Sequence, residues 1–284
     1  MEGELFEQLY RLLLAFGKRP AHCVFSDVWI AAVYLWAVLH DRPVCWACDP
    51  INWPARWQDR DLPCSSTMSD RLKRFSITQL FLAVEQHYGQ QWGESWCYWM
   101  DGLPLPVGGA TQDRQARYGR GAGVMAKGYK FHAIVQAGGG AVSWRIAPLN
   151  VNEKKMAKRM LRDLPAMSGY LVGDGEYDAN EVHRWAEQRG LRSLAPRRQG
   201  TALGHARQSD ARLRSVRLQD GPFGQDLLHG RAGIDRFFGQ WTSCPVGLKP
   251  LPPWVRGLRR VRQWVAAKLI CFYAWRHKKA RLTA

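Results

Sequence analysis

The sequence lacks an apolar run long enough to cross a bilayer. Its two longest apolar stretches, Val28 to Leu39 and Val265 to Trp275, fall short of the roughly 20 residues that a spanning helix needs. The N-terminus, Met1-Glu2-Gly3-Glu4, is acidic where a secretory signal is basic. These absences exclude an integral membrane protein and predict a cytoplasmic location.

The chain also lacks the cysteine pattern of a disulfide framework or a zinc finger. Its 7 cysteines are an odd number and are scattered along 284 residues, which is typical of reduced thiols. Cys45 and Cys48 have half the spacing of a zinc site, but no second Cys or His pair follows at finger spacing. The pair is interpreted as structural or incidental.

Acidic residues are scarce relative to basic ones. The chain has 24 Asp and Glu against 41 Lys and Arg, which gives a formal net charge of +17. Such an excess disfavours a compact fold through self-repulsion and makes a polyanion the expected partner, with nucleic acid the first candidate. A basic surface that only keeps the chain soluble is the alternative interpretation.

Residues 1–95 have the pattern of a helical domain. Apolar residues recur at helical spacing from Leu5 to Phe16, and the run from Val28 to Leu39 is apolar all round, as in a buried helix. After several prolines, a Ser/Thr cluster precedes a short helix that carries Arg71, Lys73 and Arg74. Cations on such a helix are typical of the recognition helix of a helix-turn-helix domain that binds DNA, although a solvated basic face gives the same pattern.

Residues 96–284 alternate between strand-like and helical segments. Helical stretches are predicted at Glu153 to Leu164 and Glu181 to Arg189, and a long C-terminal helix from about Pro253 to Lys278. The predicted strands are Trp96 to Met100, Lys130 to Gln136, Ala141 to Leu149, Tyr170 to Val172 and Arg192 to Ala195. This order predicts an α/β domain with a mixed sheet of the ribonuclease H type and flanking helices, with an irregular or β-containing insertion at about 196–226.

Two aspartates follow short strands and precede glycine. Asp101 comes after the aromatic strand that begins at Trp96, and Asp174 after the strand that begins at Tyr170. A third acid, Asp235, lies on a predicted helix. Carboxylates that converge from two strands and a helix suit Mg²⁺, with Mn²⁺ as the alternative, in phosphodiester chemistry.

Several segments carry the motifs of a known family, in the right order and at the right intervals. They are Met100 to Val107, Lys127 to Ala133, Ala147 to Glu153, Asp174 to Asp178 and Arg231 to Phe238. Together they resemble the DDE transposases of bacterial insertion sequences, in the group that has an N-terminal helical domain.

The resemblance implies a DNA transposase that cuts the ends of a mobile element and joins the freed 3′-hydroxyl to target DNA. It implies that Asp101, Asp174 and Asp235 are catalytic metal ligands. It further implies double-stranded DNA as the partner and a homodimer on that DNA. The basic residues expected to contact nucleic acid are Arg71, Lys73, Arg74, Lys127, Lys130, Arg231 and Arg236.

The chain departs from the family pattern around its third acid. Asp235 stands where the family has Glu, Leu228 where it has Tyr, and Thr242 where it has Lys. These departures favour an alternative, a non-catalytic DNA-binding protein descended from a transposase. A structure-selective nuclease would use the same acids, and Asp226 is the next candidate for the third one.

Overall fold

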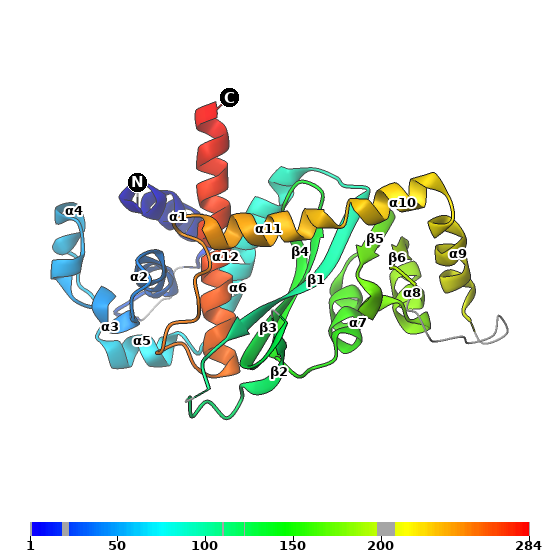
Figure 1. Cartoon of the computed structure of the whole chain (residues 1–284). Coiled ribbons are helices and arrows are strands. Elements are labelled where there is room, and N and C mark those ends of the chain that lie inside the picture. The colour runs from blue at the N-terminus through cyan, green and yellow to red at the C-terminus, as the bar shows by residue number, and fades with distance from the viewer. Residues whose placement is uncertain (1, 19–22, 110, 122, 198–207, 284) are drawn as a thin grey trace. The chain divides into compact units, whose positions relative to one another are not determined.

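The computed structural model describes residues 2–18, 23–109, 111–121, 123–197 and 208–283 (Figure 1). The chain divides into two compact units. The first unit consists of residues 1–91, 241–255 and 259–284, and the second of residues 92–240 and 256–258. The first unit therefore takes in most of the C-terminal segment, which the predicted domain division places in the catalytic domain.

The first unit is helical. Its longest N-terminal helices are α1 (Glu2–Phe16), α2 (Asp27–Leu39) and α6 (Phe75–Gly89). Ser26 caps α2 by accepting a hydrogen bond from the Trp29 N–H at 3.1 Å, and the apolar run from Val28 to Leu39 is buried as predicted. The remaining elements are α3 (Val44–Ala47), α4 (Ala55–Gln58), α5 (Ser65–Arg71), the short turns Pro50–Asn52 and Gln90–Trp92, and α12 (Leu258–Thr283).

Aromatic rings hold the short helices of the first unit together. The Phe6 ring meets the rings of Trp36, Trp53 and Trp57 edge-on, with centroids 5.1–5.3 Å apart. The indole N–H groups of Trp36 and Trp53 donate to the Asn52 and Ala47 carbonyls at 3.0 and 2.8 Å. These contacts stabilise a segment that prolines divide into pieces too short to form helices by themselves.

The second unit contains a six-stranded mixed sheet. The strand order is β2-β3-β1-β5-β6, with β4 paired to β3. Strands β1 and β3 are antiparallel, as are β3 and β4, whereas β1, β5 and β6 run parallel. The strands are β1 (Cys97–Pro106), β2 (Arg117–Gly121), β3 (Val124–Gln136), β4 (Ala141–Pro148), β5 (Gly169–Gly173) and β6 (Leu191–Leu194). The predicted ribonuclease H-like sheet, preceded by a helical region, is confirmed.

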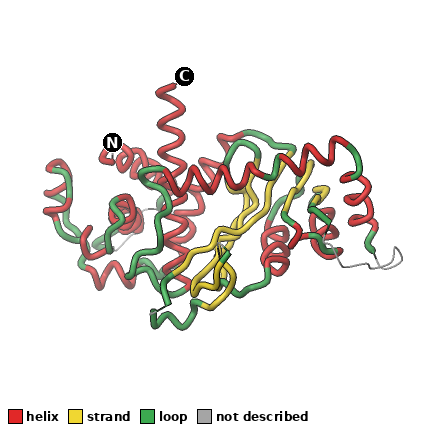
Figure 2. The backbone as a smooth tube through the Cα atoms, viewed as in Figure 1, coloured by secondary structure: helices red, strands yellow, loops and turns green. Residues whose placement is uncertain are grey.

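Helices cover both faces of this sheet, as Figure 2 shows. Along β1, Tyr98 and Met100 pack against α7 (Glu153–Asp163) and α8 (Asn180–Glu187). Cys97 and Trp99 point to the opposite face, because side chains alternate along a strand. That face is covered by α9 (Asp210–Gln219), α10 (Pro222–His229) and α11 (Ala232–Ser243).

Two predicted features differ from the structure. The strand predicted from Trp96 to Met100 is longer in the structure: β1 continues to Pro106 because β3 pairs with it from Tyr98 to Pro106. The described part of the predicted irregular insertion contains two helices, α9 (Asp210–Gln219), which Ser209 caps, and the start of α10 (Pro222–His229). Its many Arg and Gln residues are good helix formers, which explains the difference. Residues 198–207 lie outside the described part of the chain.

Candidate active site

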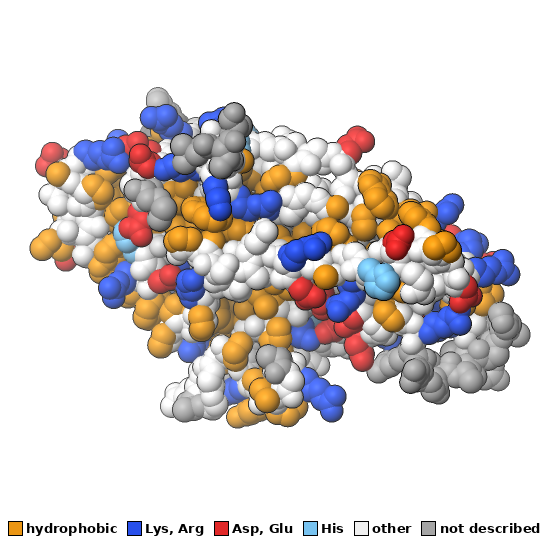
Figure 3. Space-filling view, turned by 45° about the horizontal axis from the view of Figure 1, so that its top comes forward, with side chains coloured by type: hydrophobic (Ala, Val, Ile, Leu, Met, Phe, Trp, Pro, Cys, Tyr) orange, Lys and Arg blue, Asp and Glu red, His pale blue; other side chains and the backbone are white. Residues whose placement is uncertain are grey.

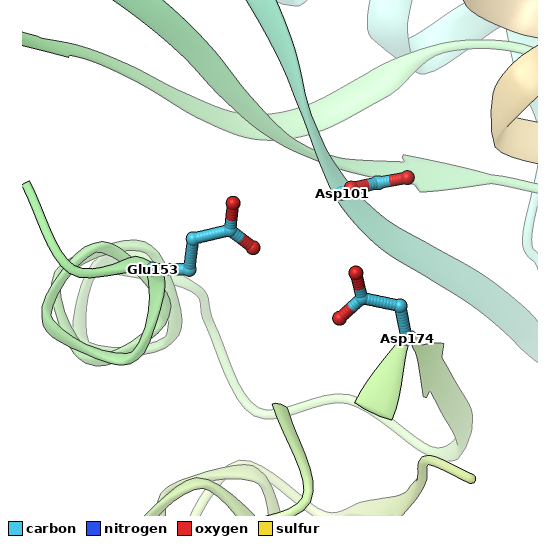
Figure 4. A group of neighbouring side chains, drawn as sticks. All are labelled: Asp101, Glu153 and Asp174. Carbon is cyan, nitrogen blue, oxygen red and sulfur yellow. The ribbon is translucent and has the colours of Figure 1, made fainter. Parts of the chain in front are cut away.

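Three carboxylates from separate segments come together at one end of the second unit's sheet. Asp101 lies within β1, Glu153 is the first residue of α7, and Asp174 directly follows β5. Each offers one oxygen, and these atoms all lie within 4.8 Å of one another. Figure 4 shows the three side chains directed toward a common space.

The parallel pairing of β1 with β5 explains why the two aspartates meet. The last pair in their register is Met100 with Gly173, so Asp101 and Asp174 are the next residue on each strand. Beyond this pair β5 ends. The backbone turns there into a short 3₁₀ helix, Gly175–Tyr177, and the Asp174 carboxylate accepts a hydrogen bond from the Glu176 N–H at 2.9 Å.

The start of α7 supplies the third carboxylate. Asn152 caps this helix by accepting from the Lys154 N–H at 2.9 Å, which fixes where the first turn begins. Lys130 of β3 donates to Glu153 Oε1 at 2.5 Å. Glu153 Oε2 is buried and has no hydrogen-bond partner of good geometry among the described residues. Lys130 therefore holds one oxygen of Glu153 in place, and the buried Tyr177 side chain interacts with the same carboxylate.

Burial and repulsion from neighbouring carboxylates disfavour the charged state of the two aspartates. Burial raises the pKa of Asp101 to about 6, and the Asp174 and Glu153 charges add to the shift. The pKa of Asp174 is also raised, by burial first and by Glu153 second. Arg231, 3.5 Å from Asp101, offsets part of the repulsion. Buried, closely spaced carboxylate oxygens are the ligands that a hard divalent cation prefers.

The comparison with known families identifies a domain that covers the whole second unit and part of the C-terminal segment of the first. The family model described as "Transposase DDE domain" matches residues 92–272, more than half of the chain. The chain belongs to the transposase DDE domain family. None of the curated proteins and none of the solved structures compared matches it. The predicted resemblance to insertion-sequence DDE transposases is confirmed.

The DDE domain brings together two of the three predicted acids. Asp101 and Asp174 are in the carboxylate group, while Asp235 lies exposed on α11 and is not one of its members. Helix α11 nevertheless starts beside the group. Arg231 contacts Asp101, and Gly233 packs so closely on the Trp99 ring that a Cβ would lie 2.4 Å from it. Asp235 is one helical turn beyond Arg231, on the stripe of α11 that begins at the site.

Glu153 is the member of the group that sequence reasoning missed. A signal for it was present, because Glu153 ends the segment Ala147 to Glu153 that resembles a family motif. No role followed from that segment alone, since only the fold brings the N-terminus of α7 to Asp101 within β1 and to the end of β5. Asp226, the reserve candidate, lies on α10 and is also outside the group.

The predicted DNA contacts of the first unit have different surroundings. Arg71 is buried, and its guanidinium donates to Asp27 at 2.6 Å, so its side chain serves the packing of α5 on α2. Lys73 is exposed and pairs with Asp70 at 2.7 Å, and Arg74 is exposed just before α6. Lys73 and Arg74 are therefore the two positions that DNA can reach without breaking a buried ion pair.

The predicted contacts of the DDE domain also differ from one another. Lys127 donates to the Thr111 carbonyl at 2.8 Å, and Lys130 is paired with Glu153 inside the site. Arg231 is half-buried at the carboxylate group, and Arg236 is exposed on α11. Arg231 is thus the predicted cation placed best to meet a phosphate at the site.

Proposed function

We propose that this protein is a DNA transposase that uses divalent metal to cut the ends of a mobile element and to join them to target DNA. The convergence of Asp101, Glu153 and Asp174 within 4.8 Å, in a DDE transposase domain, is the observation that carries the proposal. Hydrolysis and strand transfer are both phosphodiester substitutions, so one carboxylate site serves both.

Each residue of the site has a separate task in this proposal. Asp101, Glu153 and Asp174 hold the cation, proposed to be Mg²⁺ with Mn²⁺ as a substitute, through carboxylate oxygens. The bound ion would activate the attacking oxygen and stabilise the leaving one. Lys130 keeps Glu153 oriented, and Arg231 is positioned to neutralise charge on the scissile phosphate.

Asp235 is proposed to join the site when DNA is bound. Its position one turn after Arg231 supports this role, as does the place of Asp235 in the motif where the family has Glu. Aspartate is shorter than glutamate by one methylene, so its carboxylate has less reach, and metal geometry is exacting. The site is therefore proposed to depend on Glu153 more than on Asp235 for its first ion.

The charge of the chain supports double-stranded DNA as its partner. The net charge of +17 favours a polyanion, and Figure 3 shows Lys and Arg side chains spread over the face in view. The connection between α5 and α6, with exposed Lys73 and Arg74, is the proposed contact of the helical unit with element ends. A homodimer on DNA is proposed because an element has two ends to be joined. Among the described residues, no helix is both long and apolar enough to pass through a membrane.

A second function is favoured by one specific observation. The third-acid motif carries Asp235, Leu228 and Thr242 where the family has Glu, Tyr and Lys. A repurposed protein that binds DNA without cutting it would tolerate such changes, because the basic residues remain.

A comparison of the parent protein with Asp174→Asn distinguishes a transposase that cuts DNA from a protein that only binds it. The test requires element-end DNA, identified by short inverted repeats that flank the reading frame. We expect Mg²⁺- or Mn²⁺-dependent cleavage by the parent protein and none by Asp174→Asn, with DNA binding kept. Glu176→Gln, which neutralises an exposed acid two residues away, is the matched control and should cleave normally. Cleavage by Asp174→Asn at the parent rate would overturn the site, and binding without cleavage by the parent would favour the second function.

A further inference from the structure

Helix α7 carries a one-sided row of basic residues that the catalytic role leaves unexplained. The buried face of the helix consists of Met156, Ala157, Met160 and Leu161. The opposite face carries five cations, which recur every four residues along two adjacent lines of the helix. We call this set of residues the α7 basic row. Its members are Lys154, Lys155, Lys158, Arg159 and Arg162.

The α7 basic row has few ion-pair partners within the protein. Arg162 lies 3.4 Å from Asp163, whose other partner is Arg145. Lys158 rests 5.1 Å from the centre of the Trp185 ring of α8. In the described ranges, the other three members form no ion pair with an acid. Like charges four residues apart destabilise a helix, so the row does not serve the folding of α7.

The row begins beside the candidate active site. Glu153, one residue before it, points from the start of α7 toward Asp101 and Asp174 in Figure 4. From Lys154 to Arg162 the helix advances eight residues, or about 12 Å at about 1.5 Å per residue. That length matches roughly three to four phosphates of one DNA strand, which are about 3.4 Å apart along the helix axis.

We propose that the α7 basic row binds the backbone of the DNA that leaves the active site, a proposal that rests on the proposed function. Its charge is complementary to a polyanion. No large hydrophobic side chain is exposed on α7 or α8, both fully described, so the surface lacks the apolar anchors on which a protein partner relies. DNA phosphates need no such anchor, because they bind by charge and release of counterions.

The double variant Lys155→Gln/Arg159→Gln tests the row. Both side chains are exposed, so the fold should remain intact, which a melting curve checks. Binding to a duplex of arbitrary sequence is measured over a range of salt concentrations, without metal. We expect the slope of the logarithm of the binding constant against the logarithm of the salt concentration to become shallower by roughly two, at about 0.9 per lost phosphate contact. We expect the affinity itself to fall roughly ten- to a hundredfold.

The double variant Arg197→Gln/Arg214→Gln is the matched control. It changes the net charge equally, but its guanidinium groups pair with Asp220 and Glu187 on the same unit. The control should bind nearly as well as the parent protein. Equal losses in the two double variants would overturn the proposal, because net charge alone would then explain them.

Acetylation of lysines gives an independent measurement on the parent protein. Bound duplex should protect Lys155 and Lys158 from an acetylating reagent, as followed by mass spectrometry, and equal labelling with and without duplex would overturn the proposal. Neither measurement uses cleavage. A protein that binds through the row but never cuts would therefore leave this inference standing while the proposed catalysis fails. A parent protein that does not bind duplex at all would overturn both.

Discussion

The strand-held acids of the DDE domain and the helix-borne Asp235 are fixed very differently. Asp101 and Asp174 each follow the last pair of two parallel strands, so the sheet itself sets the spacing of their backbones. Asp235 stands exposed on α11, whose nearest link to the site is the 3.5 Å contact of Arg231 with Asp101. The sheet register fixes the two strand-borne acids directly, whereas Asp235 depends on side-chain packing of α11 against β1 and β3.

This difference indicates which half of the site exists before DNA arrives. The carboxylates of Asp101, Glu153 and Asp174 are gathered in the protein alone, and burial raises the pKa of Asp101 and of Asp174. Asp235 is exposed on α11 and outside this group. We therefore infer a preformed part, built on β1, β5 and α7, and a part on α11 that is completed with the substrate. The three predictions below test this comparison.

The largest effect is expected from changes of Asp235 measured by DNA cleavage. Asp235→Ala should abolish cleavage, and Asp235→Glu should keep or raise it, because Glu restores the side-chain length of the family. The larger and more tolerant Mn²⁺ should support the parent protein better than Mg²⁺ does, and Asp235→Glu should narrow that gap. Cleavage rates with each ion on element-end DNA provide the measurement.

Robust cleavage by Asp235→Ala would remove α11 from the metal site. The site would then consist of Asp101, Glu153 and Asp174 alone, and the distinction between its two parts would disappear. Asp226→Ala tests the reserve candidate for the third acid. Asp226 lies outside the carboxylate group on the preceding helix, so we expect this variant to cleave normally.

The sequence alone predicts the strand-borne half of the site well, for a physical reason. A short apolar run that ends in Asp-Gly marks both a buried strand and the place where a carboxylate becomes accessible, as at Asp101 and Asp174. The alternation of strands and helices likewise predicts the mixed sheet. Both signals are local, so no tertiary information is needed.

The features that could not be predicted depend on contacts between distant segments. Strand β2 has two glycines and little apolar pattern, and it forms because β3 extends beyond its apolar core. Backbones approach so closely there that a Cβ on Gly119 would lie 2.6 Å from the Leu149 carbonyl, and one on Gly128 2.4 Å from that of Leu105. Glu153 was missed for the same reason, since its role arises only where the start of α7 meets Asp101 of β1 and Asp174 after β5.

A smaller effect is expected on metal binding without DNA. Glu153→Gln and Asp235→Asn remove one charge each, but only Glu153 belongs to the preformed group. Glu153→Gln should weaken Mn²⁺ binding by at least roughly tenfold, the lower end of the loss seen when even a partner of a metal ligand is removed. Asp235→Asn should leave the affinity nearly unchanged. Calorimetric titration of the DNA-free proteins measures both, and equal losses would mean that α11 already contributes before DNA binds.

The smallest measured change is expected in the melting temperature of the metal-free protein, which should shift by a few degrees and depend on pH. The pKa of Asp101 rises from 3.8 to about 6 on folding, so the folded state binds this proton more tightly than the unfolded state does. Ionisation of Asp101 therefore lowers the free energy of unfolding. This penalty is absent below about pH 4, grows as the pH rises toward 6 and is constant above it. At about 1.4 kcal/mol per pKa unit it amounts to about 2–3 kcal/mol at most.

Asp101→Asn removes this penalty and should raise the melting temperature by a few degrees at pH 7 in a chelator, but hardly at pH 4. Added Mn²⁺ should make the parent protein melt at a higher temperature than Asp101→Asn at pH 7, because the bound ion stabilises the parent more. Asp235→Asn, at an exposed position, should change stability little at either pH. A loss of stability in Asp101→Asn that is equal at both pH values would show that this carboxylate stabilises the fold, contrary to the cost expected of a preformed metal site.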